Sequence, residues 1–257
     1  MRLVKQLLYG LGFLFIFSLI ILGIYTATLK PAPTCFDNKL NQDEVEVDCG
    51  GSCVSCAEKN VNQLIIGPAI LFSHERTFTA VAPITNPNKD FGTESFGYVV
   101  DFYDETGTLL KSVESKDFIY PGENKNIIDA GTKITNGVPN RVEIKIIRPE
   151  NIVWKHKDDF FFPSYSLKES LAEVEKDQLV ISGFVLNEDN FAFSKVVVGA
   201  FAIDNIGIKV GASETNLGSL NQFENKSFRI FIPLTKSLQE IIDLELVKNS
   251  VSVDVLK

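Results

Sequence analysis

The sequence predicts a mainly β protein with two tandem β-sandwiches, which follow one N-terminal transmembrane helix and a small cysteine-rich module. Three observations predict it. An uncharged run of 21 residues lies near the start of the chain, all four cysteines fall within 22 residues, and short β-type runs fill the remainder. A length of 257 residues suffices for one or two domains with apolar cores.

We expect four parts. They are a cytoplasmic stub with a transmembrane signal anchor at 1–30, a disulfide-stapled module at 31–60, and β-sandwiches at 61–158 and 159–257. Hydrophobic residues make up 45% of the chain and charged residues 23%, a composition typical of globular domains rather than disordered segments.

The anchor is predicted by the run Leu7–Ala27, which contains no charged residue. As a helix rising about 1.5 Å per residue, this run spans about 30 Å, the hydrocarbon thickness of a bilayer. A cleaved signal peptide is the alternative. Its apolar region usually has about 7–15 residues, however, and the flank TATLKPAP matches a cleavage site poorly.

Basic residues set the expected orientation. Arg2 and Lys5 precede the apolar run, and Lys30 follows it. The positive-inside rule then predicts a single-pass cell-membrane protein with its N-terminus in the cytoplasm and residues 31–257 outside, extracellular or periplasmic. Removing Arg2 and Lys5 from the 25 basic residues leaves 23 against 33 acidic ones. This negative charge disfavours nucleic acids and anionic lipid surfaces as partners.

The cysteines Cys35, Cys49, Cys53 and Cys56 are spaced C-x13-C-x3-C-x2-C. Outside the cytoplasm such cysteines form disulfides, and the sequence leaves all three pairings open. In a cytosolic protein the same pattern would favour zinc bound by four thiolates. Redox chemistry at the C-x-x-C pair is disfavoured because no βαβ pattern surrounds it.

Oxygen-bearing side chains lie between the cysteines. Asp37, Asn41, Glu44 and Asp48 offer the hard ligands that suit Ca²⁺, and Gly50-Gly51 permits a tight turn. The alternative is that these residues only form solvated turns. Calcium is therefore the candidate cofactor, and these four residues are its candidate ligands.

The stretch resembles a short motif of bacterial surface and secreted proteins, C-x-D-G-x-x-N-x-x-E-x-x-x-D-C-G-G-x-C-x-x-C. The matching residues are Cys35, Asp37, Asn41, Glu44, Asp48, Cys49, Gly50, Gly51, Cys53 and Cys56. Asn38 replaces the usual glycine, a mild departure because Asn tolerates a left-handed backbone. The resemblance implies an extracellular stapled module with calcium as its candidate ligand.

Beyond residue 62 the pattern repeats. Residues 77–110 align with 178–210, which brings Asn86 onto Asn187 at an offset of 101 residues, and Asp104-x-x-Gly107 recurs as Asp204-x-x-Gly207. The tripeptide Glu-Asn-Lys at 123–125 recurs at 224–226. These matches keep their order, and their offset stays at 100 or 101 residues, which predicts two copies of one domain of about 100 residues.

Each copy has the same predicted plan of strands, with an Asp-x-x-Gly turn after the second. In the first copy the expected strands are Phe78–Ile84, Tyr98–Tyr103, Thr108–Val113, a run from Ile127, and Val142–Ile147. In the second copy they are Leu179–Leu186, Val196–Ile203, Ile208–Ala212, a run around Phe228–Ile232, and Leu244–Val247.

This order resembles the FxLYD and late-embryogenesis-abundant-like families of immunoglobulin-like β-sandwiches. The residues that carry the resemblance are Gly183, Val185 and Asn187 in the second copy, and Asp101-Phe102-Tyr103-Asp104, Gly107 and Pro121-Gly122-Glu123 in the first. The second copy lacks the Pro-Gly pair, and Pro83 stands in the first copy where Phe184 stands in the second. The resemblance implies immunoglobulin-like surface modules without a catalytic role.

An enzyme is not expected. His74 and His156 lie in polar or charged segments, and neither has a nucleophile or metal ligand at a recognisable spacing. No Gly-rich phosphate loop, G-x-S-x-G or H-E-x-x-H motif occurs. Asp104 and Asp204 are interpreted as turn formers rather than as an acid–base pair.

The junction between the copies is rich in aromatic residues. It carries Trp154, the only tryptophan, and the run Phe160, Phe161 and Phe162. Consecutive residues of a strand face opposite sides, so three aromatics cannot all enter one core. We expect either a contact between the domains or an exposed patch that binds a partner, and we take these four residues as candidate partner-binding residues.

These features predict a non-catalytic, membrane-anchored cell-surface protein that presents protein-binding β-sandwiches in an envelope assembly. Its expected partners are the membrane, through the N-terminal helix, and envelope or surface proteins. The alternative is a ligand-binding sensor or transport accessory subunit that holds a small apolar molecule between its sheets. A hydrolase with an unrecognised site is a third hypothesis.

Overall fold

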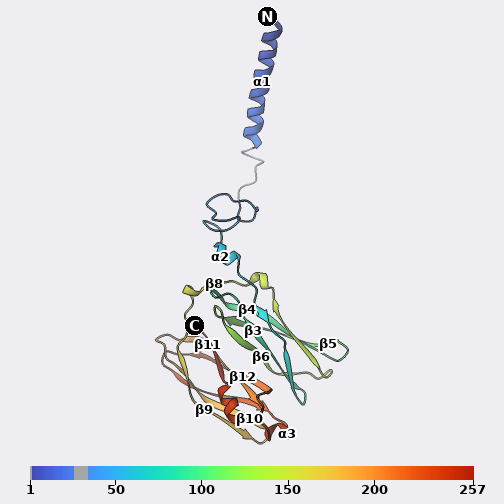
Figure 1. The fold of residues 1–257 in the computed structure, drawn as a ribbon, viewed down its shortest axis with the longest axis vertical. Helices are drawn as coiled ribbons and strands as arrows, with labels where there is room; N and C mark the ends of the chain where they lie inside the picture. The colour runs from blue at the N-terminus through green and yellow to red at the C-terminus, as the bar shows by residue number, and fades with distance from the viewer. Residues whose placement is uncertain (1, 26–33) are drawn as a thin grey trace. The chain divides into compact units, whose positions relative to one another are not determined.

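The computed structural model describes residues 2–25 and 34–257 (Figure 1). The end of the predicted span at Thr26 and Ala27, and also Lys30, lie outside the described residues. The chain divides into two compact units, Met1–Asn60 and Val61–Lys257.

The first unit begins with one long helix, α1 (Arg2–Ile24). Its segment Val4–Ile24 is long and apolar enough to cross a membrane. The large apolar side chains that face outward along α1 are all more than half exposed, from Val4 at 64% to Ile24 at 55%. A helix satisfies its own backbone hydrogen bonds, which is the condition for a single segment to lie in lipid.

The rest of the first unit, from residue 34 to residue 60, consists of turns and one short helix, α2 (Cys56–Lys59). The Ser55 hydroxyl caps α2 by accepting a hydrogen bond from the backbone N–H of Glu58. An isolated bridge joins Glu46 and Cys49. Cys49 is the buried apolar side chain of this segment, so the segment has almost no core of its own.

The second unit begins with a β-sandwich of two antiparallel sheets, the first sandwich. In one sheet β3 lies centrally, and in the other β4 does. The strands of the first sheet are β1 (Ile65–Ile66), β2 (Ile70–His74), β3 (Thr77–Thr85) and β6 (Asn124–Lys133). Those of the second are β4 (Phe91–Tyr103), β5 (Leu109–Ile119), β7 (Arg141–Ile147) and β8 (Lys155–His156).

The second sandwich also has two antiparallel sheets, with β10 and β11 as their central strands. One sheet contains β9 (Tyr165–Glu175), β10 (Gln178–Asn187) and β13 (Asn225–Pro233). The other contains β11 (Phe193–Ile203), β12 (Lys209–Leu220) and β14 (Ser252–Leu256). Short 3-10 turns at Pro149–Asn151 and Lys157–Asp159 precede it in the chain, and α3 (Lys236–Gln239) and α4 (Leu244–Asn249) lie near its end.

Both sandwiches pair their strands in the same way. β3 pairs with β6 as β10 pairs with β13, and β4 lies between β5 and β7 as β11 lies between β12 and β14. The mainly β fold class, with one N-terminal apolar helix and a cysteine-rich segment, is therefore confirmed. The common origin of the two halves and the boundary between them stay predictions.

Each sandwich has its own apolar core, built by alternation along the strands. Phe78, Ala80 and Ile84 of β3 point into the first core, and Val196, Val198 and Ala200 of β11 point into the second. Both predicted Asp-x-x-Gly turns form. The Asp104 carboxylate accepts backbone N–H groups of Thr106 and Thr108, and Gly107 takes a φ of 84° that favours glycine.

One predicted strand is wrong. Residues Leu244–Val247 belong to the helix α4, and the last strand is β14. The reason is a local capping interaction, because the Asp243 carboxylate accepts hydrogen bonds from the backbone N–H groups of Glu245 and Leu246. A short run of apolar residues does not distinguish a strand from a helix turn, and the capping aspartate decides it here.

Candidate functional site

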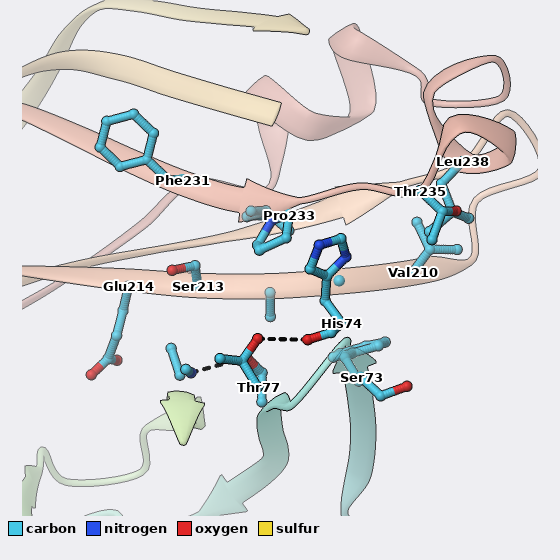
Figure 2. Close-up of a pocket in the computed structure, with 17 residues that line it drawn as sticks. Ser73, His74, Thr77, Val210, Ser213, Glu214, Phe231, Pro233, Thr235 and Leu238 are labelled. Carbon is cyan, nitrogen blue, oxygen red and sulfur yellow. Dashed lines mark hydrogen bonds between the residues drawn. The ribbon is translucent and has the colours of Figure 1, made fainter. Parts of the chain in front are cut away.

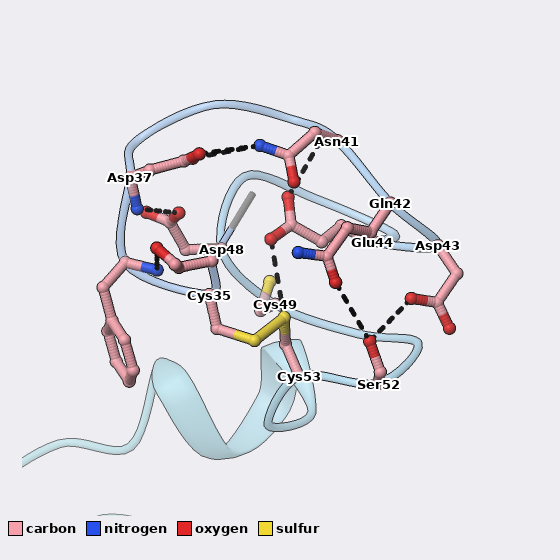
Figure 3. Close-up of a disulfide and its surroundings, with 12 residues drawn as sticks. Cys35, Asp37, Asn41, Gln42, Asp43, Glu44, Asp48, Cys49, Ser52 and Cys53 are labelled. Atoms are coloured by element: carbon pink, nitrogen blue, oxygen red, sulfur yellow. Dashed lines mark hydrogen bonds between the residues drawn. A yellow bond between two sulfur atoms is a disulfide. The ribbon is translucent and has the colours of Figure 1, made fainter. Parts of the chain in front are cut away.

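Two disulfides cross-link the cysteine-rich segment, and Figure 3 shows the one between Cys35 and Cys53. Cys35 is bonded to Cys53 with Cα atoms 5.6 Å apart, and Cys49 to Cys56 with Cα atoms 4.9 Å apart. This is one of the three pairings that the sequence left open. Sulfur atoms in disulfides do not act as thiolate ligands, so the segment in this form does not bind zinc through four thiolates.

The Gly50-Gly51 pair lets the chain turn tightly between the bridges. Both residues have positive φ angles, 83° and 60°. A Cβ atom at Gly51 would lie 2.2 Å from the backbone oxygen of Asp43, a distance that no side chain tolerates. The glycines are therefore required by close packing of backbone on backbone.

The predicted calcium ligands form a chain of hydrogen bonds within the protein (Figure 3). The buried carboxylate of Asp48 accepts the backbone N–H groups of Asp37 and Asn38 at 2.9 and 3.0 Å. Asn38 has a φ of 57°, the left-handed conformation expected where the motif usually has glycine. These hydrogen bonds hold residues 37 and 38 against Asp48, which directly precedes Cys49 of the second disulfide.

The two other carboxylates also have donors. Asp37 accepts the side-chain amide of Asn41 at 2.9 Å, and Glu44 accepts the backbone N–H of Asn41 at 3.1 Å. The side-chain oxygen of Asn41 is buried and has no hydrogen-bond partner among the described residues. Calcium binding stays a prediction. Melting the protein with and without a chelator tests it, and an unchanged midpoint would discard calcium as a ligand.

The aromatic junction joins the two sandwiches. Trp154 is half-buried against the first core. The ring centroids of Phe160 and Phe162 lie 5.5 and 5.4 Å from that of Tyr120 in the first sandwich. Phe161 points the other way, with its centroid 5.5 Å from that of Phe191 in the second sandwich. The alternation expected of consecutive residues thus places neighbouring rings on different sandwiches.

Exposure differs among the three phenylalanines. Phe160 is 9% exposed, whereas Phe161 and Phe162 are 55% and 60% exposed. The hydroxyl of Tyr120 donates a hydrogen bond to the carbonyl oxygen of Val255 at 2.9 Å, a second link between the sandwiches. The junction therefore makes an interdomain contact, and the exposed rings of Phe161 and Phe162 leave partner binding there as a prediction.

A buried charge network also links the sandwiches. The Nζ atom of Lys125 lies 2.7 Å from Asp117 and 3.5 Å from Asp254 across the interface, and Lys195 of the second sandwich lies 3.5 Å from Asp117. Burial lowers the pKa of Lys125, but Asp117 and Asp254 outweigh it and the pKa is raised. The Nζ atom also lies 4.2 Å from the centroid of the buried Phe118 ring.

In the sequence, Lys125 stands out only as part of a Glu-Asn-Lys tripeptide that occurs twice. Its counterpart Lys226 binds the carbonyl oxygens of Leu217 and Ser219 within its own sandwich. The same tripeptide thus has two roles, and no signal in the sequence separates them.

Beside this network the outer faces of two sheets pack together. Val81 and Ile128 of the first sandwich form an apolar cluster with Phe201 and Ala212 of the second. At Gly199 a Cβ atom would lie 3.2 Å from the Cδ1 atom of Ile128, so a small residue is favoured beside this side chain. Apolar packing and buried charges together hold the two sandwiches in one compact unit.

Among the described residues, neither histidine ring makes a hydrogen bond with a hydroxyl or thiol group. His156 lies beside Asp158, with 3.2 Å between its Nδ1 atom and the carboxylate, and His74 lies at the end of β2. That the protein has no catalytic function stays a prediction.

Comparison with known proteins identifies no family. No known protein family and no curated protein matches the sequence. Among solved structures, red sea bream transglutaminase is similar with a TM-score of 0.23 and 8% identity, over 77% of this chain and 31% of that chain. A β-glucuronidase from glycoside hydrolase family 2 is similar with a TM-score of 0.21 and 11% identity, over 80% of this chain and 26% of that chain.

The chain thus spans less than a third of the length of either enzyme.

Proposed function

We propose that this protein is a non-catalytic cell-surface protein, anchored in the membrane by α1, which presents two β-sandwiches as one binding body in an envelope assembly. The observation that carries the proposal is the exposure of α1. Apolar side chains along its whole length are uncovered by the protein, and such a surface in water is strongly unfavourable. Lipid tails would cover it.

The compartment is inferred from the cysteines and the flanking charges. Disulfides persist in oxidising compartments, so the pairs Cys35–Cys53 and Cys49–Cys56 support a position outside the cytoplasm. Arg2 and Lys5 ahead of α1 support an N-terminus inside. The cysteine-rich segment and both sandwiches then lie on the extracellular or periplasmic side.

The likeness to FxLYD and late-embryogenesis-abundant-like domains supports a binding role. The equal strand pairing of the two sandwiches agrees with two copies of one immunoglobulin-like domain. Fusing the copies through a buried interface removes the freedom that a flexible linker would give, so that a partner would meet both sandwiches in one fixed arrangement.

The partner surface that we propose contains Phe161 and Phe162. Aromatic residues are enriched at protein interfaces, and these two rings remain more than half exposed beside the interdomain contact. Envelope or surface proteins are the class of partner that a membrane-anchored chain would meet there.

Protease treatment of whole cells tests the location. We expect a protease added outside to digest residues 61–257 in intact cells. If this region is digested only after lysis, the proposed orientation is wrong.

Site-specific photo-crosslinking in intact cells tests the partner surface. A crosslinker placed at Phe161 or Phe162 should join the chain to an envelope protein, and the double change Phe161→Ser and Phe162→Ser should abolish co-purification of that protein. Phe223→Ser is the matched control because Phe223 is 63% exposed on another loop. An equal loss of co-purification with Phe223→Ser, or crosslinks formed only within this chain, would contradict the proposed surface.

A further inference from the structure

One ion pair of the interdomain charge network is buried on both sides. The side chain of Lys125 is 6% exposed and that of Asp117 is 15% exposed, and the Nζ atom lies 2.7 Å from Oδ2 of the carboxylate. Lys157 makes an equally short pair with Asp90 at 2.6 Å, but these side chains are 48% and 55% exposed. Lys125 and Asp117 therefore hold an amine and a carboxyl group together out of water.

Two charged groups of the second sandwich complete the cluster. The other oxygen of Asp117, Oδ1, lies 3.5 Å from the Nζ atom of Lys195 on β11. The carboxylate of Asp254 on β14 lies 3.5 Å from the Nζ atom of Lys125, whose other side faces the ring of Phe118, with its centroid 4.2 Å away. Each oxygen of Asp117 thus has its own lysine, and the nitrogen of Lys125 has a second carboxylate.

This arrangement favours a reaction between the buried pair. Two buried charges carry a desolvation cost that their attraction only partly offsets. An amide between Nζ of Lys125 and the carboxyl carbon of Asp117 is neutral, so its formation removes that cost. A contact of 2.7 Å to one carboxylate oxygen leaves the carboxyl carbon, one bond further, near the separation of about 3–3.5 Å from which bonds form.

We propose that Lys125 and Asp117 condense to an amide with loss of one water molecule, which joins β5 covalently to β6 and so links the two sheets of the first sandwich. The Nζ atom first passes one proton to Oδ2 of Asp117, which leaves a neutral amine and a neutral carboxyl group. The amine attacks the carboxyl carbon, and the ammonium group of Lys195 stabilises the negative charge that develops on Oδ1.

Asp254 carries the second proton. Its carboxylate takes this proton from the attacking nitrogen and gives it to Oδ2 of Asp117, which departs as water. Both protons of that water come from the original ammonium group of Lys125. Asp254 and Lys195 therefore end as they began, and the reaction needs no other reactant.

The surroundings of these groups fit the proton transfers. Burial lowers the pKa of Lys125, but Asp117 and Asp254 outweigh it and the pKa is raised, so the nitrogen starts protonated and requires a base. Burial raises the pKa of Asp254, which makes its carboxylate a better proton acceptor than an exposed aspartate. Asp254 and Lys195 belong to the second sandwich, so the bond forms only after the two sandwiches have packed together.

A small cavity gives the released water a place. It has a volume of about 140 Å³, and its lining includes Asp117, Lys195, Asp254 and Glu214. This volume exceeds the share of about 30 Å³ that one molecule occupies in liquid water. Glu214 also lines a larger cavity of about 300 Å³ between the sandwiches, where Figure 2 shows it on β12. The water therefore does not have to cross either apolar core.

The second sandwich has the equivalent lysine without a carboxyl group to react with. Lys226 corresponds to Lys125, and the residues 100 and 101 positions after Asp117 are Leu217 and Gly218. The Nζ atom of Lys226 donates a hydrogen bond to the carbonyl oxygen of Leu217 at 2.7 Å. That carbonyl already belongs to an amide, so no condensation follows. We expect the bond in the first sandwich only.

Peptide mass spectrometry of the full chain tests the proposal. The folded chain is purified in detergent, denatured, reduced, and digested with trypsin and with a protease that cuts after glutamate. A cut after Glu123 separates Asp117 from Lys125 unless an amide joins them. We expect peptides 117–123 and 124–133 as one branched species, lighter than their sum by one water molecule and uncut after Lys125. A dehydrated aspartate elsewhere would also lose water but would not join these peptides.

Three variants assign the parts. Lys125→Arg keeps the positive charge but should abolish the branched species, whereas Lys226→Arg, the matched control in the second sandwich, should leave it unchanged. Asp254→Asn removes the proton carrier and should slow its appearance after synthesis at least about tenfold.

The unmodified chain decides whether the bond exists, whatever the variants do to folding. Recovery of peptides 117–123 and 124–133 only as separate species, after prolonged incubation of the folded chain, would overturn the proposal. The same branched species from Lys125→Arg would overturn it as well, and undiminished formation in Asp254→Asn would overturn the role of Asp254.

Discussion

The cysteine-rich segment and the sandwich pair become ordered in different ways. In the segment from residue 34 to residue 60, Cys49 is the buried apolar side chain. This segment is held in place by two disulfides and by the hydrogen bonds that the Asp48 carboxylate accepts from backbone N–H groups. In the sandwiches, side chains such as Phe102 and Phe193 are fully buried in cores. A segment too short to bury a core therefore depends on covalent links for the stability that a core would supply.

The two sandwiches differ from each other in their charges. At equivalent places, Lys125 enters the buried network with Asp117 and Asp254, and Lys226 binds carbonyl groups of its own sandwich. The two lysines thus differ because Lys125 lies at the face where the sandwiches meet and Lys226 does not.

Removing a core side chain should have the largest effect. We expect Phe102→Ala to lower the free energy of unfolding of the sandwich pair by about 3–5 kcal/mol, because it leaves a cavity around a fully buried ring. Urea unfolding followed by tryptophan fluorescence measures it through Trp154, which packs against the same core. The control is Phe36→Ala in the cysteine-rich segment, where the ring is 85% exposed and a change within about 0.5 kcal/mol is expected.

Equal destabilisation by the two substitutions would break the comparison, because it would mean that Phe36 supports a core.

Removing a disulfide should affect the other region. The pair Cys35→Ser and Cys53→Ser opens a bridge with a sequence separation of 18 residues, for which loop entropy predicts a loss of about 3 kcal/mol. We expect hydrogen exchange of residues 34–60 to accelerate and that of residues 61–257 to stay unchanged. Unchanged protection of the short segment would show that contacts other than the bridge order it.

A smaller effect is expected from the buried carboxylate. Asp48→Asn keeps the shape but removes the charge that accepts the N–H groups of Asp37 and Asn38, which should cost about 2 kcal/mol within the cysteine-rich segment. Hydrogen exchange at these two amides measures it directly. Glu46→Gln changes an exposed carboxylate of the same segment and should have little effect. If both variants exchange alike, the Asp48 bonds do not contribute to the order.

The smallest effect expected is a change of stability with pH, which should have opposite signs in the sandwich pair and in the cysteine-rich segment. Burial raises the pKa of Glu214 from 4.5 to about 7, so the stability that its protonated form contributes to the sandwich pair is present below pH 4.5 and is lost as pH rises to about 7. Burial also raises the pKa of Glu123, Asp129 and Asp254, which acts in the same direction. The urea midpoint of residues 61–257 should therefore fall between about pH 5 and pH 7.5.

In the cysteine-rich segment the sign is reversed. The hydroxyl of Ser52 holds the pKa of Asp43 below 3.8, so its contribution is present above pH 3.8 and is lost only in more acidic solution. Glu214→Gln should flatten the dependence of the sandwich pair. A midpoint that rises from about pH 5 to pH 7.5 in the unmodified chain would contradict the raised pKa of these carboxyl groups.

Much of the fold was predictable because its determinants are local. The turns at Asp104 and Asp204 formed as expected, since an aspartate accepts N–H groups two and four residues later whatever surrounds it. The strand predicted at Leu244–Val247 failed for a reason that is also local, the cap at Asp243, and could have been found from the sequence.

The candidate site was less predictable. The sequence indicated that the four cysteines form two disulfides with one another. It did not indicate the partner of each cysteine, because the spacing permits every pairing. It marked Phe160, Phe161 and Phe162 as unusual, and the packing of the whole unit decided which sandwich each ring meets. The burial of Lys125 depends on contacts with residues far along the chain, such as Asp254.

By itself, the sequence determined the apolar helix, the β-type alternation, the turns and the stretch that carries the disulfides. Each follows from residues within one helical turn, one strand or one loop, where backbone geometry and side-chain chemistry act directly. The tertiary structure alone decided the disulfide pairing and the interface between the sandwiches. Those depend on which surfaces meet, and neither composition nor spacing specifies that.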